Sequence, residues 1–227
     1  MLFQFPYAMN IETTADGSPT LYVPELDEHY HSTKGALTES RHIFIEMGLR
    51  QSTAPCSHVL EVGFGTGLNA FLTLLDADKS RRPVCYTGIE LHPVQTTTLR
   101  ALDYPALICP GRTDDFYRLH EAPWETDVAL TPHFTLRKVQ ADFTTWTPDE
   151  TYDVVYFDAF APEKQPSMWA GPLFDRLYAS LSEGGILTTY CAKGIVRRML
   201  QAAGFHVERL PGPPGGKREI LRAVKTI

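Results

Sequence analysis

No part of this sequence constrains the fold more than segment 59–69, which reads VLEVGFGTGLN. It begins with a short apolar run of strand character. Three glycines in five residues follow, Gly63, Gly65 and Gly67, and they allow the backbone to turn tightly and to approach a ligand closely. The residues after them favour a helix whose N-terminal N–H groups point back at the turn. We therefore predict a strand–turn–helix unit that holds a nucleotide-type cofactor.

The spacing of these glycines indicates which cofactor the turn binds. A dinucleotide-binding turn has the pattern G-x-G-x-x-G, whereas this turn reads G-x-G-x-G, with Glu61 two residues before the first glycine. The pattern resembles motif I of the class I S-adenosylmethionine-dependent methyltransferases, E/D-x-G-x-G-x-G. That cofactor has no pyrophosphate but carries a cationic amino group, which Glu61 can face. The alternative is a glycine turn that only joins a strand to a helix. The spacing disfavours a dinucleotide oxidoreductase.

Length and composition fit one large domain, or one domain with an extension. The chain has 227 residues, of which 43% are hydrophobic. No apolar run is long enough to span a bilayer, and residues 1–6 lack the features of a secretory signal. The four cysteines are scattered and include no C-x-x-C pair, which argues against a zinc site or a disulfide framework. These observations predict a cytoplasmic protein with no bound metal and no membrane contact.

From residue 59 onward, strand-like apolar runs alternate with helical patterns, as a doubly wound sheet requires. We predict an α/β fold with a mostly parallel, seven-stranded, Rossmann-like methyltransferase sheet whose last strand is antiparallel. The stretch before the third strand is predicted as an irregular surface insertion with a short helix at 115–120. The predicted strands are residues 59–62, 84–90, 135–139, 152–160, 186–191, 205–210 and 219–224, and the main helices are 68–75, 94–102, 169–181 and 194–203.

Residues 1–55 precede the cofactor strand and are predicted to form an extension packed on the methyltransferase domain, residues 56–227. Within the extension, two strand-like runs flank the turn signal Asp16-Gly17, which predicts a β-hairpin. Residues 37–49 have the apolar periodicity of a helix, with Thr38 as its N-cap.

In an open parallel sheet, ligands bind outside the carboxyl ends of the strands. Glu90 ends the second predicted strand, 23 residues after Gly67, where an acid commonly bonds the ribose hydroxyls of a cofactor. Asp142 follows the third strand and precedes an aromatic residue, so this pair can bond and stack on the adenine. Asp158 follows the fourth strand. The alternatives are a charge at the start of the next helix for Glu90, a helix cap for Asp158 and an ordinary loop residue for Asp142.

Asp158 begins the segment D-A-F-A-P, which lies where amine-directed methyltransferases carry an acid–Pro–Pro–aromatic turn. Its carboxylate and the neighbouring backbone carbonyls can accept the N–H bonds of a target amine and aim the nitrogen lone pair at the methyl group. Whether Asp158 takes a proton from the amine or only orients it stays open here, because a carboxylate also stabilises the protonated amine.

Residues 157–169, FDAFAPEKQPSMW, resemble the D-x-F-A-P-x-K-x-P-x-M-W block of the MnmC-type tRNA methyltransferase domain. The longer members of that family also carry a FAD-dependent oxidoreductase domain, which this chain is expected to lack. The resemblance extends from about residue 29 to residue 223 and includes GFGTGLN at 63–69, KGALTESR at 34–41, GIVRR at 194–198, AGF at 203–205 and KRE at 217–219.

The resemblance implies methyl transfer from S-adenosylmethionine to the exocyclic amine of 5-aminomethyl-(2-thio)uridine at the tRNA wobble position, giving 5-methylaminomethyl-(2-thio)uridine. An upstream wobble-uridine modification enzyme would then have to supply the aminomethyl group. The implied catalytic residues are Asp158 and Phe160. The implied cofactor-binding residues are Glu61, Gly63, Gly65, Gly67, Asn69, Glu90, Asp142 and Asp158.

Contact with tRNA is expected from aromatic and basic side chains. Splayed anticodon-loop bases are typically read by aromatic residues, and the candidates for stacking on the uracil are Tyr30, Phe160 and Trp169. Residues 193–222 hold seven Lys and Arg against two Glu, a local charge of +5, although the whole chain carries −6. The candidate phosphate contacts are Lys164, Lys193, Arg197, Arg198, Lys217 and Arg218.

Two other functions stay open at this point. A methyltransferase, or a related aminopropyl-type transferase, acting on a small-molecule amine would use the same Asp158 site and suits the acidic net charge. A non-enzymatic RNA-binding or cofactor-sensing module would keep the fold without the chemistry, and the intact glycines, Glu90 and Asp158 argue against it.

Overall fold

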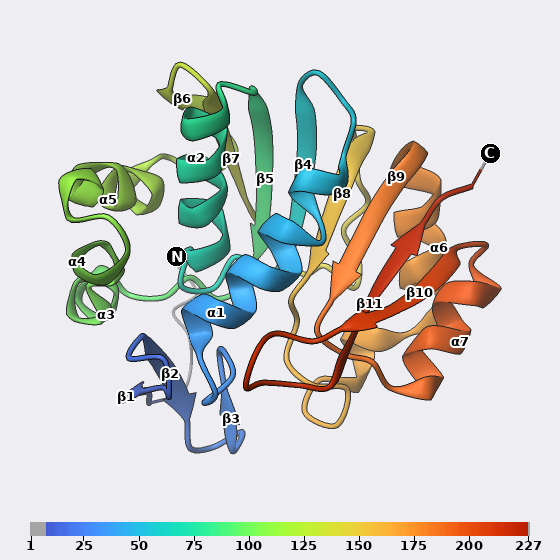
Figure 1. Ribbon diagram of the computed structural model, residues 1–227, viewed down its shortest axis with the longest axis horizontal. Coiled ribbons are helices and arrows are strands. Elements are labelled where there is room, and N and C mark those ends of the chain that lie inside the picture. The colour runs from blue at the N-terminus through green and yellow to red at the C-terminus, as the bar shows by residue number, and fades with distance from the viewer. Residues whose placement is uncertain (1–7, 227) are drawn as a thin grey trace.

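The structure is a computed structural model that describes residues 8–226 and is built around one eight-stranded sheet (Figure 1). Residues 1–7, on which the expected absence of a secretory signal rests, lie outside the described part. The strands in sequence order are β4 (Ser57–Val62), β5 (Val84–Glu90), β6 (Val128–Thr131), β7 (Phe134–Gln140), β8 (Tyr152–Phe157), β9 (Leu181–Thr189), β10 (His206–Pro211) and β11 (Glu219–Val224).

The sheet has the order β10-β11-β9-β8-β4-β5-β7-β6. Its five central strands, from β9 to β7, run parallel, whereas β11 and β6 run antiparallel to their inner neighbours. The predicted fold class is confirmed, including the antiparallel last strand, but the sheet has one strand more than predicted. The additional strand, β6, has only four residues and lies in a proline-broken stretch, so its pattern is too short to recognise without its partner.

Helices lie on both faces of this sheet, as Figure 1 shows. The predicted helices are present with shifted ends, and the helix predicted to begin at Trp169 begins at Gly171, after a 3₁₀ turn. No helix within residues 8–226 is both long and apolar enough to cross a bilayer. The helices are α1 (Ala36–Ser40), α2 (Leu68–Ser80), α3 (Thr96–Leu102), α4 (Tyr104–Ile108), α5 (Thr113–Glu121), α6 (Gly171–Ser180) and α7 (Gly194–Ala202), with a π-helical turn at Arg41–Glu46 and 3₁₀ turns at Leu49–Gln51, Pro110–Arg112 and Pro166–Trp169.

Alternation along the central strands places a hydrophobic core on each face of the sheet. On β8, Val154 and Tyr156 pack into one core, and Val155 and Phe157 pack into the other. Successive side chains of a strand point to opposite faces, so each core receives every second residue. Helices α2 and α5 contribute to the first core, and α6 and α7 contribute to the second. Both faces are therefore covered, which explains the nearly continuous apolar runs of the central strands.

The N-terminal extension forms the predicted hairpin and shares a core with the sheet. Leu21 of the hairpin and Phe44 of the π-helical turn belong to the same buried cluster as Val59 of β4. In Figure 1 the hairpin lies at the lower edge of the molecule, toward which the central strands point with their carboxyl ends. The hairpin strands β1 (Asn10–Thr13) and β2 (Pro19–Val23) form a three-stranded sheet with β3 (Glu28–His29), in the order β1-β2-β3.

The helix predicted over 37–49 departs from expectation, and Thr38 is not its N-cap. Thr38 lies inside α1, which ends at Ser40 and continues as the π-helical turn. The capping group is Asp16 from the hairpin turn, whose Oδ2 accepts hydrogen bonds from Thr38 N at 2.8 Å and Thr38 Oγ1 at 2.7 Å. Asp16 Oδ1 also accepts from Ser18 N at 3.0 Å. One carboxylate therefore closes the hairpin and joins it to α1.

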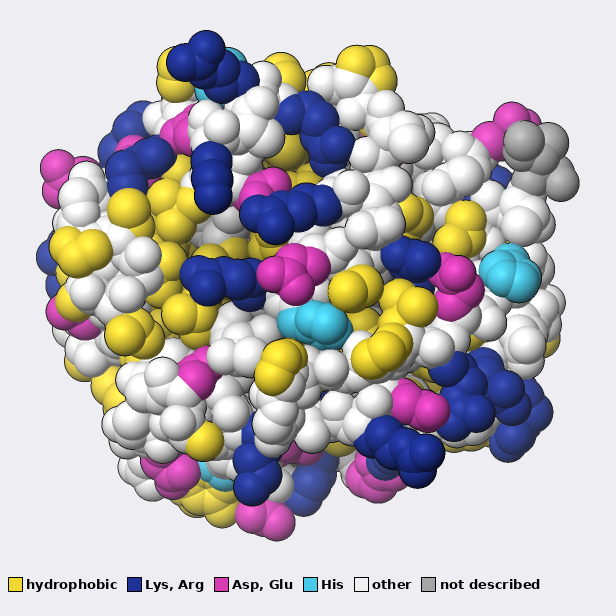
Figure 2. Space-filling model, viewed as in Figure 1, with side chains coloured by type: hydrophobic (Ala, Val, Ile, Leu, Met, Phe, Trp, Pro, Cys, Tyr) yellow, Lys and Arg dark blue, Asp and Glu magenta, His cyan; other side chains and the backbone are white. Residues whose placement is uncertain are grey.

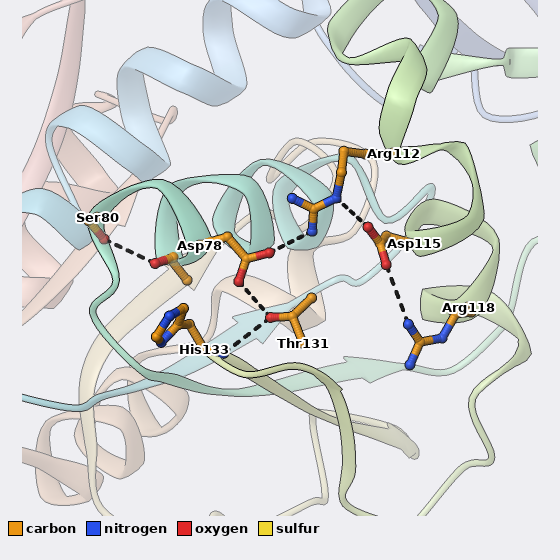
Figure 3. Close-up of polar contacts among 8 residues, drawn as sticks. Asp78, Ser80, Arg112, Asp115, Arg118, Thr131 and His133 are labelled. Atoms are coloured by element: carbon orange, nitrogen blue, oxygen red, sulfur yellow. Dashed lines mark hydrogen bonds and ion pairs between the residues drawn. The ribbon is translucent and has the colours of Figure 1, made fainter.

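The stretch before β7, predicted as an irregular insertion, is fixed to α2 by a polar network (Figure 3). The Arg112 guanidinium lies between the carboxylates of Asp78 on α2 and Asp115 on α5. Asp78 also accepts a hydrogen bond from Thr131 Oγ1 on β6 at 2.7 Å, and Asp115 pairs with Arg118 at 3.4 Å. These contacts hold α2, α5 and β6 together.

We expect Asp16→Asn to lower the free energy of unfolding by about 1–2 kcal/mol, the usual range for loss of a helix cap. Asparagine keeps one acceptor oxygen but turns an NH₂ group toward the donors of Thr38 or Ser18. The matched control is Asp27→Asn, because Asp27 is exposed in the next turn with a φ of +46°, which asparagine tolerates. Urea denaturation at pH 7 measures both variants, and equal losses would contradict the capping role.

Candidate active site

A cavity opens at the carboxyl ends of β4, β5, β7 and β8, where an open parallel sheet binds its ligand. Its empty volume is about 870 Å³, the open mouth included. Glu61 and Gly67, two of the predicted cofactor residues, do not line it. The predicted residues that line it are Tyr30, Gly63, Gly65, Asn69, Glu90, Asp142, Asp158 and Phe160.

The glycine turn between β4 and α2 is packed so closely that it has no space for side chains. Gly63 and Gly67 have φ values of +92° and +72°, a conformation that strains residues with a Cβ. A Cβ on Gly63 would lie 2.9 Å from the Asp158 carbonyl oxygen, and one on Gly67 would lie 2.7 Å from the His120 ring. The lack of a side chain at Gly67 therefore lets the turn pack closely against His120 of α5. Gly63 and Gly65 form part of the cavity wall.

The side-chain amide of Asn69, in the first turn of α2, joins two carboxyl groups on neighbouring strands. Its Nδ2 donates to Glu61 Oε1 and to Asp158 Oδ2, both at 2.9 Å. Glu61 is only 1% exposed, and its burial raises its pKa well above the usual range, with the nearby Asp158 adding to the effect. The structure thus corrects the expectation that Glu61 faces the cofactor: it is buried beneath the glycine turn as a partner of Asn69.

Asp158 has the properties of a group that exchanges protons near neutral pH. Burial raises its pKa to about 7, although the Asn69 hydrogen bond acts in the opposite direction. The backbone fixes its position, because Asp158 N donates to Val62 O at 3.0 Å and so extends the pairing of β8 with β4. A carboxyl group of this kind can accept a proton or an N–H bond from an amine in the cavity.

Glu90 and Asp142 lie at the ends of β5 and β7, where they were predicted, and both are held by backbone N–H groups. Glu90 Oε2 accepts from Gly65 N at 3.0 Å and its Oε1 accepts from His92 N at 2.9 Å. Burial raises the pKa of Glu90. Asp142 Oδ1 accepts from Thr144 N at 2.8 Å. Both carboxyl groups are thus fixed at the cavity and can accept further hydrogen bonds from a ligand.

The three aromatic candidates separate into two that line the cavity and one that does not. Tyr30 and Phe160 line it and contact each other edge to face, with ring centroids 5.0 Å apart. Trp169 is 3% exposed and packs against Phe157, and its Nε1 donates to Phe160 O at 2.8 Å. Trp169 is therefore a buried support for the Phe160 backbone, which corrects its predicted role as a stacking surface.

Comparison with known proteins identifies relatives of this chain. A family model described as S-adenosyl-L-methionine-dependent methyltransferase matches residues 117–226. The chain is 34% identical, over 92% of its length, to the tRNA 5-methylaminomethyl-2-thiouridine biosynthesis bifunctional protein MnmC of Cupriavidus metallidurans. It is 31% identical, over 95% of its length, to the protein of the same name from Pseudoalteromonas atlantica. The chain spans only 32% and 33% of the length of these two relatives.

Solved structures show the same fold. MnmC2 from Aquifex aeolicus superposes with a TM-score of 0.75 at 23% identity, over 99% of this chain and 72% of that one. Spermidine synthase from Thermotoga maritima superposes with a TM-score of 0.62 at 16% identity, with the same two shares. At these identities the likeness concerns the fold alone.

The chain is an S-adenosyl-L-methionine-dependent methyltransferase, and residues 117–226 carry its match to that family. S-Adenosylmethionine is its cofactor, and the cavity fits that molecule. The tight glycine turn allows close approach of the methionine part, and Glu90 offers acceptors where the ribose of such cofactors binds. Asn69 Oδ1 is buried and has no hydrogen-bond partner within residues 8–226, so an acceptor stands beside Asp158 for a cationic group.

Three of the six predicted phosphate contacts are already paired with carboxylates in this methyltransferase. Lys164 lies 3.7 Å from Asp27, Lys193 pairs with Glu163, and Lys217 lies 2.8 Å from Glu39. The other three, Arg197, Arg198 and Arg218, form no ion pair with any described residue. In Figure 2, Lys and Arg side chains gather at the lower right, over the region where Figure 1 places α7, the helix that carries Arg197 and Arg198.

The pairing of Lys217 belongs to a chain of contacts that sequence reasoning missed. The Lys217 ammonium lies 3.8 Å from the centre of the Tyr190 ring, and Tyr190 Oη donates to Ala159 O at 2.9 Å. Glu39, which binds Lys217, is 7% exposed and also accepts from Ser32 N. No local pattern could show these contacts, because 178 residues separate Glu39 from Lys217.

A second feature missed by sequence reasoning is the buried Lys138 of β7. It is 1% exposed, and its Nζ donates to His120 O at 2.5 Å and lies 4.7 Å from the centre of the Trp124 ring. Burial lowers the pKa of Lys138 to about 8. Its contacts hold α5 against β7, behind the glycine turn.

In the cofactor-free methyltransferase, Asp158→Asn should raise the free energy of unfolding at pH 8 but not at pH 4. The folded-state pKa of about 7 lies above the ordinary 3.8. The folded protein therefore binds an extra proton between these values, and wild-type stability falls as pH rises through them. We expect a gain of about 1–3 kcal/mol at pH 8, within the upper limit of about 4 kcal/mol set by the pKa difference.

Chemical denaturation at the two pH values measures this effect. Asp142→Asn is the control, because Asp142 accepts hydrogen bonds from Thr144 N and Oγ1, and its loss should destabilise the protein. An Asp158→Asn variant whose stability changes equally at pH 4 and pH 8 would show that Asp158 does not titrate as described.

Proposed function

We propose that this methyltransferase transfers a methyl group from S-adenosylmethionine to the exocyclic amine of 5-aminomethyl-(2-thio)uridine at the tRNA wobble position, giving 5-methylaminomethyl-(2-thio)uridine. The observation that carries the proposal is the placement of Asp158, a partly buried carboxyl group with a pKa of about 7 in a cavity shared by the glycine turn and the Tyr30–Phe160 ring pair. The names of the bifunctional relatives support the substrate class.

The Asp158 carboxylate, rather than the backbone beside it, is proposed to hold the amine. The carbonyl oxygen of Ala159 already accepts from Tyr190 Oη, and that of Phe160 accepts from Trp169 Nε1. Both carbonyls thus have a partner from the protein. The carboxylate of Asp158, held by Asn69 from one side, keeps acceptor positions for the N–H bonds of a substrate.

The cofactor supplies an electrophilic methyl group on a positively charged sulfur. A substrate amine needs a free lone pair to accept it, yet aliphatic amines are mostly protonated at neutral pH. Asp158 is a stronger base than an ordinary aspartate because burial raises its pKa to about 7. We therefore assign it two successive tasks: it accepts a proton from the ammonium and then orients the remaining N–H bonds.

The uracil ring is proposed to stack on the Tyr30–Phe160 pair, which lines the same cavity as Asp158. Arg197, Arg198 and Arg218 are the proposed phosphate contacts, since Lys164, Lys193 and Lys217 are engaged by carboxylates. An upstream modification activity is proposed to supply the aminomethyl group. Action on tRNA agrees with the cytoplasmic location expected from the sequence.

Methyl transfer from tritiated S-adenosylmethionine to two bulk tRNA preparations tests the proposal. One preparation comes from cells that make the aminomethyl group but do not methylate it, and the other is fully modified. Label should enter only the first, and Asp158→Ala should slow the transfer at least about 100-fold, a typical cost of losing a general base. The control Asp149→Ala changes an exposed carboxylate before β8 and should leave the rate unchanged.

A different result would identify the alternative substrate class. If neither tRNA preparation is labelled while S-adenosylmethionine still binds, the wobble-uridine proposal fails. The same Asp158 site would then serve a small-molecule amine, and the acceptor would have to be sought among metabolites.

Arg198→Ala and Arg218→Ala should each weaken tRNA binding and lower the slope of log affinity against log salt by about 1 or somewhat less, the expected effect of losing one phosphate contact. Both side chains are exposed and form no ion pair within the described part of the chain. Lys79→Ala, at the exposed far end of α2, is the control and should leave the slope unchanged. If all three variants keep the wild-type slope, these arginines do not contact tRNA phosphates.

A further inference from the structure

We propose that Cys56, His58 and Cys85 form a binding site for a thiophilic divalent metal, with Zn²⁺ as the preferred ion, at the end of the sheet opposite the cofactor cavity. Sequence spacing argued against any zinc site, because no two cysteines form a C-x-x-C pair. That argument does not apply to residues which two parallel strands bring together.

Strand register places the three side chains in one cluster. β4 and β5 run parallel, with His58 directly opposite Cys85, so both side chains point to the same face of the sheet. Cys56 stands two residues before His58, just ahead of the first residue of β4. Residues two apart on an extended chain also share a face. The N-terminal ends of both strands thus present two thiols and an imidazole to one point.

The distances suit a metal better than a disulfide. The potential ligand atoms of the three residues all lie within 4.8 Å of one another, and the two sulfur atoms are 4.0 Å apart. Two thiolates on a tetrahedral Zn²⁺ lie about 3.8 Å apart, given a Zn–S distance of about 2.3 Å. A disulfide would need the sulfur atoms at about 2.05 Å. If the three side chains move slightly inward around an ion, each of them can form one bond to it.

The surroundings can complete the ligand set. Glu150 Oε2 lies 3.8 Å from His58 Nδ1, while Glu150 Oε1 is paired with Arg137 at 3.4 Å. A carboxylate in this place can bind the ion or orient the imidazole, and both arrangements are common at zinc sites. His58 is also fixed through its backbone, since its N donates to Asp153 Oδ2 at 2.9 Å. The side chains of His58 and Glu150 are 41% and 40% exposed, so an ion in solution can reach them.

Nitrogen and thiolate ligands together favour Zn²⁺ over Mg²⁺ or Ca²⁺, which bind oxygen. A bound ion would join the starts of β4 and β5 to the segment before β8. Because this end of the sheet is remote from Asp158, the site would contribute to stability rather than to methyl transfer. It does not depend on the proposed function.

Titration with Co²⁺ tests the site in the reduced, metal-free and untagged chain. We expect one equivalent to bind with a thiolate-to-cobalt charge-transfer band, and Zn²⁺ to abolish the band by displacement. Cys56→Ser and His58→Gln should each weaken binding at least tenfold or so, the lower end for a perturbed zinc site. Cys109→Ser, a half-buried cysteine elsewhere, should bind as the wild type does.

His58→Gln keeps the test informative if Cys56→Ser folds poorly, because the His58 side chain is partly exposed. The proposal fails if the wild type gives no charge-transfer band. It fails equally if both ligand variants bind as tightly as Cys109→Ser. A Cys56–Cys85 disulfide in the isolated protein, without metal uptake after reduction, would also overturn it.

Discussion

The active site depends on two carboxyl groups from adjacent strands, of which Glu61 is buried and Asp158 is partly buried. Glu61 and Asp158 lie at the carboxyl ends of β4 and β8, and a buried carboxylate without a partner costs several kcal/mol. A single side-chain amide carries two N–H donors, and Asn69 uses both, one for each carboxyl group. The glycine turn places Asn69 there, since it ends at Gly67 and α2 starts at the next residue. The turn therefore shapes the cavity and also positions Asn69, whose amide donates a hydrogen bond to each carboxyl group.

The local elements of this arrangement could be predicted from sequence, and the long-range contacts could not. The glycine turn, the hairpin around Asp16 and the acids at the strand ends depend on neighbouring residues, whose types restrict the backbone directly. The direction of Glu61 depends on which face of β4 it occupies, and both faces are buried. The same limit applies to Trp169, because a large aromatic residue after a cavity loop fits a core as well as a binding surface.

The N-terminal extension and the C-terminal loop belong to the active site as much as the central sheet does. Tyr30, from the extension, lies on the cavity wall. Glu39, at α1, binds Lys217 of the loop between β10 and β11, and Lys217 lies over Tyr190, which is hydrogen-bonded to Ala159. Segments from both ends of the chain thereby support the residue that follows Asp158. A core shared by the extension and the sheet makes this support rigid.

The electrostatics of the cavity favour a ligand that carries positive charge. Burial is the main cause that raises the pKa of Asp158, the Glu39 carboxylate adds to it, and Lys217 opposes it. A cationic cofactor or an ammonium substrate in this cavity would act as Lys217 does and would stabilise the ionised form. Binding of a cation would therefore offset part of the desolvation cost of the ionised Asp158 carboxylate.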